Sequence, residues 1–166
     1  MSCIDGQESS MHVCMLFRIL RIAEVKPNFL HRMLQSRQCV KVLARIWNRR
    51  NQALNDTLLC YLNPQPTDRI LEIGFGGAYL LEKILPHLQT GMVCGVDISE
   101  GMVRRCSKQF RSHIASGKLD LKCSSAEKRS YPARHFGKVC MVNSIFYWQD
   151  AEAGMMEIHR SKLPNP

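Results

Sequence analysis

Residues 70–81 (ILEIGFGGAYLL) constrain the fold of this chain more than any other segment. An apolar run typical of a buried strand leads into Gly74, Gly76 and Gly77, and a helical pattern follows. Glycine adds no side chain, so such a turn lets backbone N–H groups and a helix N-terminus approach a polar ligand closely. Glu72 lies near the end of the strand, where its charge would repel a phosphate but suit an ammonium group. The segment predicts a strand–turn–helix unit of an α/β protein that binds a small polar ligand.

An acidic residue also ends the next predicted strand. Residues 92–96 (MVCGV) are apolar, and Asp97 follows them, 23 positions after Gly74. In open α/β sheets ligands bind beyond the carboxyl ends of the strands, where an acid can accept hydrogen bonds from ribose hydroxyls. A helix is expected after Asp97, with Ser99 as its N-cap and Glu100 in its first turn. The spacing alone fits NAD as well as other nucleoside cofactors.

The glycine pattern separates these cofactor classes. The dinucleotide fingerprint G-x-G-x-x-G would need glycine at position 79, where Tyr79 stands, and no Gly-Lys-Ser/Thr of a phosphate loop follows. The order acid-x-G-x-G-x-G fits Glu72, Gly74 and Gly76, with Ala78 in place of the last glycine. In this pattern the chain resembles class I S-adenosylmethionine (SAM)-dependent methyltransferases, in particular the small-molecule, methyltransferase type 11-like group.

Two later segments extend the resemblance over roughly residues 70–160. Residues 119–124 (LDLKCS) alternate like a strand, and the following Ser125, Ala126 and Glu127 resemble the Asp-Ala-Glu turn that meets the adenine in these enzymes. Residues 136–143 (FGKVCMVN) resemble the strand that runs into their active site. Residues 143–148 would then lie where methyl donor and acceptor meet. The order of the four segments is more specific than any single motif.

The resemblance implies SAM as the cofactor, and we expect no metal. The residues that would form the SAM site are Glu72, Gly74, Gly76, Gly77, Asp97, Ile98, Ser125, Ala126, Glu127 and Asn143. Glu72 would act near the ammonium group and Asp97 would hold the ribose. Ile98 and Ala126 would flank the adenine, and Asn143 would lie at the mouth of the methyl channel. No residue is assigned as a general base, so the catalytic residues are left open.

The resemblance also implies a Rossmann-like three-layer α/β/α sandwich with a parallel sheet. The four predicted strands, numbered along the chain, would pair in the order 3-2-1-4. The family's sheet continues beyond the fourth strand, whereas this sequence stops at Pro166, so the chain resembles a C-terminally truncated member. The fourth strand would then be an open hydrophobic edge. A homodimer or a partner chain is expected to cover it.

The N-terminal part carries less information. Residues 1–37 are predicted as an extension that is partly helical or disordered, and residues 38–166 as the SAM-binding domain, with a core at 69–166 and an incomplete C-terminal half. Residues 11–25 are apolar but too short and too charged for a membrane span. A helix is expected over residues 38–62. Its apolar face would comprise Val42, Leu43, Ile46, Trp47, Leu54, Leu58 and Leu59.

Composition narrows the remaining function classes. The eight cysteines contain no Cys-x-x-Cys pair, which argues against a zinc ribbon or a disulfide scaffold and favours a reducing, cytoplasmic location. The net charge of +9 is dispersed, and no aromatic–basic pattern of an RNA-binding module is present. Methyl transfer to a small-molecule acceptor is the leading hypothesis. The alternatives are an inactive SAM-binding fragment or regulatory protein, an RNA or DNA methyltransferase, and an NAD-dependent oxidoreductase.

Overall fold

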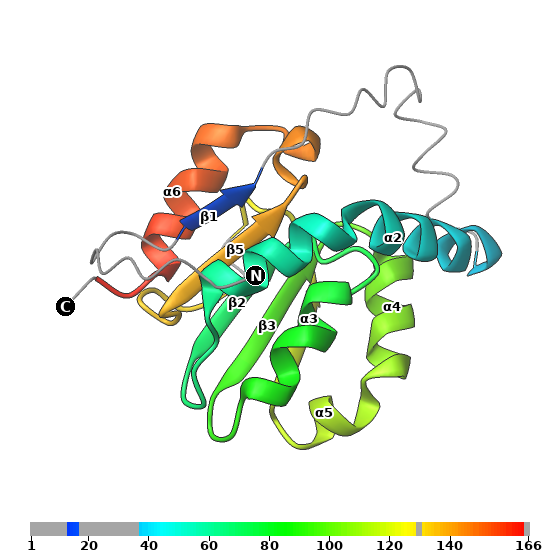
Figure 1. The fold of residues 1–166 in the computed structure, drawn as a ribbon. Helices are drawn as coiled ribbons and strands as arrows, with labels where there is room; N and C mark the ends of the chain where they lie inside the picture. The colour runs from blue at the N-terminus through cyan, green and yellow to red at the C-terminus, as the bar shows by residue number, and fades with distance from the viewer. Residues whose placement is uncertain (1–12, 17–36, 129–130, 165–166) are drawn as a thin grey trace.

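The computed structural model describes residues 13–16, 37–128 and 131–164 (Figure 1). Its helices and strands, in chain order, are β1 (Val13–Leu16), α2 (Arg37–Leu62), β2 (Arg69–Ile73), α3 (Tyr79–Ile84), η1 (Leu85–His87), β3 (Met92–Asp97), α4 (Glu100–Gln109), α5 (Arg111–Ala115), β4 (Leu119–Cys123), β5 (Lys138–Val142), η2 (Ile145–Tyr147) and α6 (Ala151–Ser161). None of the described helices is long and apolar enough to span a membrane.

The strands form one parallel sheet with the order β1-β5-β2-β3-β4. The four strands expected from the sequence are β2, β3, β4 and β5, so their predicted pairing order is confirmed. β2 lies between β3 and β5, and Glu72 is in register with Gly95 on one side and Cys140 on the other. The carboxyl ends of these three strands therefore meet at one edge of the sheet, which is where ligands bind in open α/β sheets.

A fifth strand, β1, covers the outer edge of β5. Val13 pairs with Val139, and Leu16 pairs with Val142. From the sequence, an open edge is expected at the fourth strand and a partly helical or disordered extension over residues 1–37. For residues 13–16 both expectations are wrong, because these residues add a parallel strand that uses the backbone groups of β5. Residues 1–12 and 17–36 lie outside the described part of the chain.

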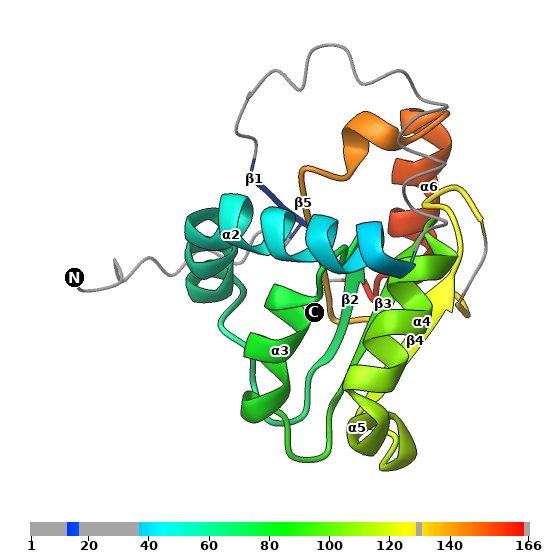
Figure 2. The same ribbon diagram turned by 90° about the vertical axis from the view of Figure 1, so that its right-hand side faces the viewer.

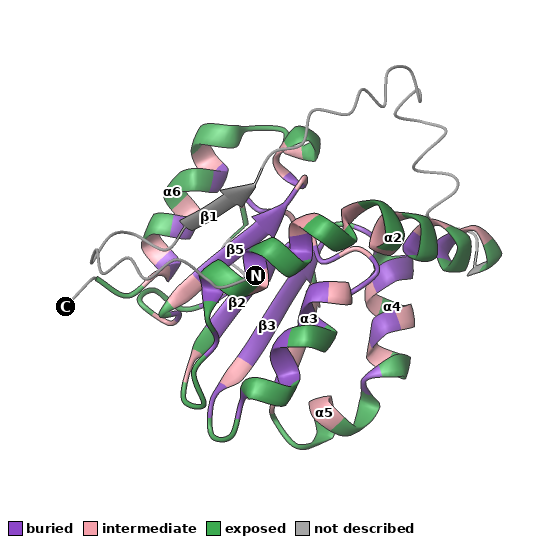
Figure 3. Ribbon diagram, viewed as in Figure 1, coloured by how far each residue is buried: buried purple, intermediate pink, exposed green. Residues whose placement is uncertain are grey.

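Two apolar cores lie on the two faces of the sheet, since successive strand side chains point in opposite directions. Ile70 and Val93 pack in the core that α2, α3 and α4 cover, whereas Leu71 and Val139 pack with Ile158 of α6. Figure 2 shows α2 and α3 on one side of the sheet and α6 on the other. The inner strands are buried along most of their length, as expected for strands covered on both faces (Figure 3). The predicted three-layer sandwich is confirmed.

Helix α2 buries most of its predicted apolar face, since Leu58 is buried and Leu43, Trp47, Leu54 and Leu59 pack against the core. Val42 and Ile46 are 53% and 43% exposed, so their assignment to the apolar face is wrong. The buried positions of α2 are Val40, Ala44, Asn55, Leu58 and Leu62. The predicted face is therefore wrong at Val42 and Ile46, and the buried face includes Ala44 and the polar Asn55 instead.

Candidate functional site

A cavity of about 860 Å³ opens at the carboxyl ends of β2, β3 and β5 and is bordered by α2. The residues that the sequence analysis assigns to the SAM site all line it: Glu72, Gly74, Gly76, Gly77, Asp97, Ile98, Ser125, Ala126, Glu127 and Asn143. The fold thus brings four separate segments of the chain to one site. What each residue binds stays a prediction.

The glycine turn after β2 has no space for side chains at two positions. Gly74 has a left-handed φ of +75°, and a Cβ there would overlap the side chain of Ser144. A Cβ at Gly77 would overlap the side-chain amide of Asn48, which donates from Nδ2 to the Gly77 carbonyl oxygen at 3.1 Å. The segment after β5 and the helix α2 therefore hold the turn from two sides.

Ala78, the departure from the glycine pattern, also adopts a left-handed conformation. Its φ is 63°, and its methyl group is buried in the core. A left-handed alanine costs roughly 1–2 kcal/mol, and burial of the methyl group offsets part of this cost. The turn thus keeps at position 78 the backbone shape that a glycine would adopt without strain.

The Asp97 carboxylate joins the end of β3 to the glycine turn. It is buried, and it accepts hydrogen bonds from the Gly76 N–H at Oδ2 and from the Ser99 N–H at Oδ1, both at 2.8 Å. Burial raises the pKa of Asp97, and these two hydrogen bonds oppose the shift. An ionised carboxylate has about four lone-pair sites, so both oxygens can accept a further hydrogen bond from a ligand. Ser99 caps α4 as predicted, because its side chain accepts from the Met102 N–H.

Glu72 is a buried carboxyl without a full set of partners. Its side chain is 4% exposed, and Oε2 has no hydrogen-bond partner among the described residues. Desolvation by burial and the nearby Asp97 charge raise the pKa of Glu72 to about 8, although a backbone hydrogen bond from Leu81 opposes the shift. The carboxyl is therefore largely protonated at neutral pH when no cation is near. A cationic group in the cavity would favour the ionised form and pair with it.

Two further oxygen atoms lack partners next to the turn. Asn143 follows β5 with a left-handed φ of 55°, and its Nδ2 donates to Asn51 Oδ1 at 3.0 Å. Its Oδ1 and the Oγ of Ser144 are buried without a hydrogen bond to any described residue. Both residues line the cavity, as Glu72 does. Buried polar groups are normally hydrogen-bonded, so three such atoms in one wall indicate a ligand that supplies donors.

The loop that follows β4 contacts the start of α6 through Glu127. Glu127 lines the cavity, but its Oε1 accepts from the backbone N–H groups of Gln149 and Asp150, at 2.9 and 3.3 Å. Partial burial raises the pKa of Glu127, but hydrogen bonds to the carboxylate outweigh this effect and hold the pKa below its ordinary value. This carboxylate thus connects two loops in addition to forming part of the wall. Ala126 beside it is buried, whereas Ile98 presents a 59% exposed apolar side chain to the cavity.

Helix α2 contributes residues that the sequence analysis does not identify. Asn48, Asn51 and Asn55 line the cavity, and they are spaced by three and four residues along one side of the helix. Asn48 contacts the glycine turn and Asn51 contacts Asn143, so α2 connects the two ends of the site. The available signal was a row of asparagines at helical spacing inside an apolar pattern. Such a row indicates a buried polar contact and not a solvated face.

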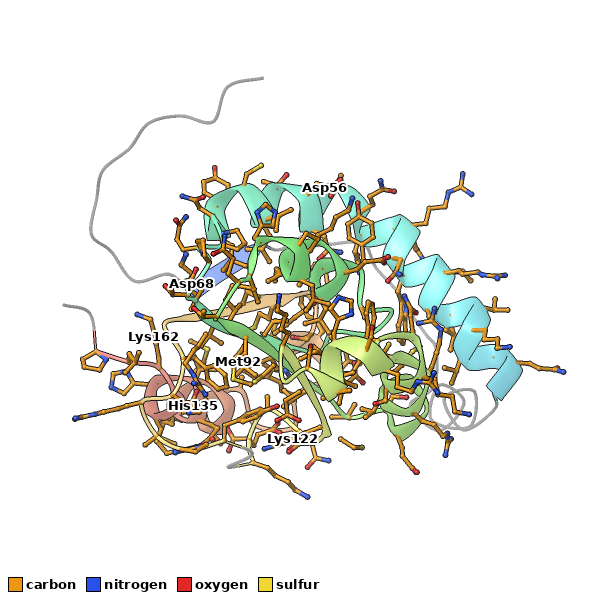
Figure 4. All side chains as sticks on the ribbon, turned by 90° about the horizontal axis from the view of Figure 1, so that it is seen from below. Asp56, Asp68, Met92, Lys122, His135 and Lys162 are labelled. Atoms are coloured by element: carbon orange, nitrogen blue, oxygen red, sulfur yellow. The ribbon has the colours of Figure 1, made fainter. Side chains whose placement is uncertain are left out.

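Histidines and metal ligands play no visible part in this site. No histidine lines the cavity among the described residues, and within the same residues no group of His, Cys, Asp and Glu side chains could hold a metal ion. His135 contacts Arg69 instead, and burial together with the Arg69 charge lowers the pKa of His135. Figure 4 shows His135 and Lys162 on the α6 side of the sheet and Asp56 on the α2 side.

Comparison with known proteins assigns the chain to a family. The family model described as a methyltransferase domain matches residues 70–165, which contain the glycine turn and every strand end of the site. The chain belongs to this methyltransferase family. Among curated relatives, YdaC of Bacillus subtilis (strain 168), named as an uncharacterized methyltransferase, is 30% identical to this chain over 114 residues. The match covers 69% of this chain and 61% of YdaC, so the chain spans less than two thirds of that relative.

Solved structures share the fold of this chain. A SAM-dependent methyltransferase from Aquifex aeolicus superposes with a TM-score of 0.59 at 16% identity, covering 66% of this chain and 58% of that one. The [4+2]-cyclase SpnF superposes with a TM-score of 0.62 at 19% identity, covering 71% of this chain and 43% of that one. Since a protein named as a cyclase has this fold too, the fold alone does not determine the reaction.

Proposed function

We propose that this chain binds SAM in the cavity and transfers the sulfonium methyl group to a small-molecule acceptor. The observation that carries the proposal is the set of unpaired oxygen atoms of Glu72, Asn143 and Ser144 beside the glycine turn. An ammonium group has three donors and no acceptor, so it fits this wall. The amino-acid part of SAM carries such a group, and its positive charge would favour the ionised form of the buried Glu72 carboxyl.

The remaining predicted residues fit the other parts of the cofactor. Asp97 accepts one backbone hydrogen bond at each carboxylate oxygen. Each oxygen therefore keeps a lone pair that can accept a hydrogen bond from a ribose hydroxyl. The apolar side chains of Ile98 and Ala126 suit the faces of an adenine, and Ser125 suits its polar edge. Gly74, Gly76 and Gly77 line the cavity and add no side chains to it, so the methionine part would pass near the backbone.

A dinucleotide fits the same turn less well. The Gly76 N–H already donates to Asp97, so it is not available to a pyrophosphate. The buried Glu72 carboxyl below the turn would repel phosphate charge whenever it is ionised. These contacts disfavour the NAD-dependent oxidoreductase, and they support SAM as the cofactor.

SAM supplies an electrophilic methyl group on a good leaving group, so orientation and exclusion of water can provide much of the catalysis. The chain's own residues fit this task. Asn48 fixes the glycine turn, and Asn51 fixes Asn143 at the end of β5. Since no histidine lines the cavity among the described residues, an acceptor that needs no strong base from the protein suits the site.

We also propose that the chain works in the cytoplasm and that residues 38–166 act as the SAM-binding domain. Cys94 and Cys106 are buried as thiols, which supports a reducing compartment. A partner chain is not needed to cover β5, because β1 occupies that edge. An inactive SAM-binding protein is the main alternative, and methyl transfer in a substrate screen separates it from the enzyme.

Calorimetry with SAM, S-adenosylhomocysteine and NAD tests the cofactor proposal directly. We expect micromolar binding of both sulfur ligands and no binding of NAD. Asp97→Ala should weaken S-adenosylhomocysteine binding about a hundredfold, because roughly 3 kcal/mol of hydrogen bonding to a charged acceptor is lost. Asp120→Ala, at a partly exposed carboxylate of β4 outside the cavity wall, is the matched control and should keep full affinity. Equal affinity in the two variants, with both folded by circular dichroism, would remove Asp97 from the site.

A further inference from the structure

The outer part of the cavity has an aromatic wall that the cofactor residues do not form. Trp47 comes from α2, Phe146 and Tyr147 from η2, and Trp148 from the segment that follows. Phe146 is 62% exposed and Tyr147 is 46% exposed, although each has a large apolar ring. Exposed aromatic side chains that gather at a cavity mark a binding surface for an apolar or flat ligand.

Two of these rings are held in place by close packing. A Cβ at Gly154 of α6 would overlap the Trp148 ring, so the indole lies directly on the helix backbone. A Cβ at Gly76 would lie 3.4 Å from Cε3 of Trp47, so this ring lies against the glycine turn. The aromatic wall therefore begins next to the proposed cofactor and is fixed at both ends.

The same wall carries one cation whose charge is not neutralised by a described residue. Arg50 follows Trp47 by three positions and precedes Leu54 by four, which places the three on one stripe of α2. Arg50 is exposed and makes no ion pair with a described residue.

The carboxylates of the wall do not reach Arg50. Asp97 and Glu127 accept hydrogen bonds from backbone N–H groups, and Glu72 lies buried at the glycine turn. Arg50 and Lys128 are the cations that line the cavity among the described residues, and Arg50 is the one that lies on the same stripe of α2 as Trp47.

We propose that this part of the cavity binds the methyl acceptor, and that the acceptor is a flat aromatic molecule with one anionic group that pairs with Arg50. This inference rests on the proposed function, because it assigns the acceptor to the space beside the cofactor. About 860 Å³ lies near the upper end of the roughly 300–1,000 Å³ found for small-molecule sites. A cavity of this size has room for an acceptor beside a nucleoside cofactor. A guanidinium binds a carboxylate or phosphate through two parallel hydrogen bonds, so the anionic group would also fix the orientation of the ring.

Tryptophan fluorescence tests the inference without any turnover. The chain has two tryptophans, Trp47 and Trp148, and both line this cavity, so quenching reports on the site alone. The probes are 4-nitrobenzoate, a flat anion, and 4-nitrobenzamide, its neutral counterpart, each titrated with and without saturating S-adenosylhomocysteine. We expect 4-nitrobenzoate to bind about tenfold more tightly than the amide in the presence of S-adenosylhomocysteine, as one charge-assisted pair would provide.

Three variants assign this preference to a residue. Arg50→Gln should remove the preference for the anion and leave amide binding unchanged. Arg49→Gln removes the same charge from the neighbouring position outside the cavity wall, and Lys128→Gln removes the other lining cation. Both should keep the preference within about twofold, as for surface charges that do not touch the ligand.

The outcomes separate this inference from the cofactor proposal. Equal binding of the two probes to the wild-type chain would overturn the acceptor assignment, whatever S-adenosylhomocysteine does. Displacement of 4-nitrobenzoate by S-adenosylhomocysteine, together with weaker S-adenosylhomocysteine binding in Arg50→Gln, would place Arg50 in the cofactor site and also overturn it. An Arg50-dependent preference in a chain that does not bind S-adenosylhomocysteine would support the anion site and refute the cofactor proposal.

Discussion

At the scale of single residues, Glu72 makes the stability of the fold depend on pH. Its carboxyl is buried in the fold and solvated in the unfolded chain, so its pKa of about 8 in the fold compares with an ordinary 4.5. Between these two values the folded chain binds more protons than the unfolded one. The contribution of Glu72 to the free energy of unfolding is therefore full below about pH 4.5 and is lost as the pH rises through about 8, by at most about 1.4 kcal/mol per pH unit.

Glu72→Gln should remove this dependence, because the amide is neutral at every pH. We expect the variant to gain stability over the wild type as the pH rises from 6 to 9, by on the order of 2 kcal/mol or more. Urea unfolding at several pH values measures the difference. Glu82→Gln, at an exposed position of α3, is the control and should show no such trend. A constant difference between Glu72→Gln and the wild type would show that Glu72 is ionised in the fold.

Gly74 has a left-handed φ and also no space for a Cβ. A comparison with Gly117 separates these two constraints. Gly117 has almost the same φ, +74°, but a Cβ there would meet no atom within 4 Å. Gly117→Ala should therefore cost only the strain of a left-handed alanine, about 1 kcal/mol. Gly74→Ala adds an overlap with Ser144, so it should cost clearly more and weaken S-adenosylhomocysteine binding at least about tenfold. Thermal melts and calorimetry of both variants measure this, and equal melting temperatures would contradict the close approach of Ser144.

At the scale of secondary-structure elements, β1 and α2 secure the two sides of β5. β1 pairs with the outer edge of β5, and α2 contacts Asn143 just after its end. An uncovered apolar edge strand offers its backbone groups to other chains and promotes aggregation. β1 therefore protects the strand whose end supplies Asn143 and Ser144 to the site.

Proline in β1 should expose this edge. In the double variant Cys14→Pro/Met15→Pro, two adjacent residues lose their N–H groups, so the ladder to β5 is weakened whichever of them donates. We expect faster aggregation on heating, measured by light scattering. Cys14→Ala/Met15→Ala keeps both N–H groups and is the matched control. Identical aggregation of the two double variants would mean that β1 does not protect β5.

At the scale of the whole molecule, the inner strands of the sheet can be predicted from the sequence more easily than the edge strand β1. The runs that became β2, β3 and β5 are apolar because both faces are covered, and turn residues bound each of them. β1 could not be identified in this way, because it has four residues and its partner lies more than a hundred positions away. Pairing between distant segments leaves no local periodicity in the sequence.

The residues of the candidate site were also predicted only in part. Its predicted residues follow strand ends, and the topology gathers the ends of parallel strands at one edge of the sheet. Asn48, Asn51 and Asn55 escaped prediction because polar residues inside a helix are assigned to the solvent side by periodicity alone. Val42 and Ile46 were misplaced in the opposite sense, because periodicity assigns apolar residues to the core side although these two are exposed.

The pairing of Val13 with Val139 also has a consequence for the order in which the chain folds. On the ribosome, β1 is made before its partner strand exists, and it must wait until residues 138–142 have been synthesised. Closing so long a loop carries a large entropic cost before any contact compensates for it. β1, the first of the described strands to be made, thus joins the sheet only after β5, the last of them, has been made.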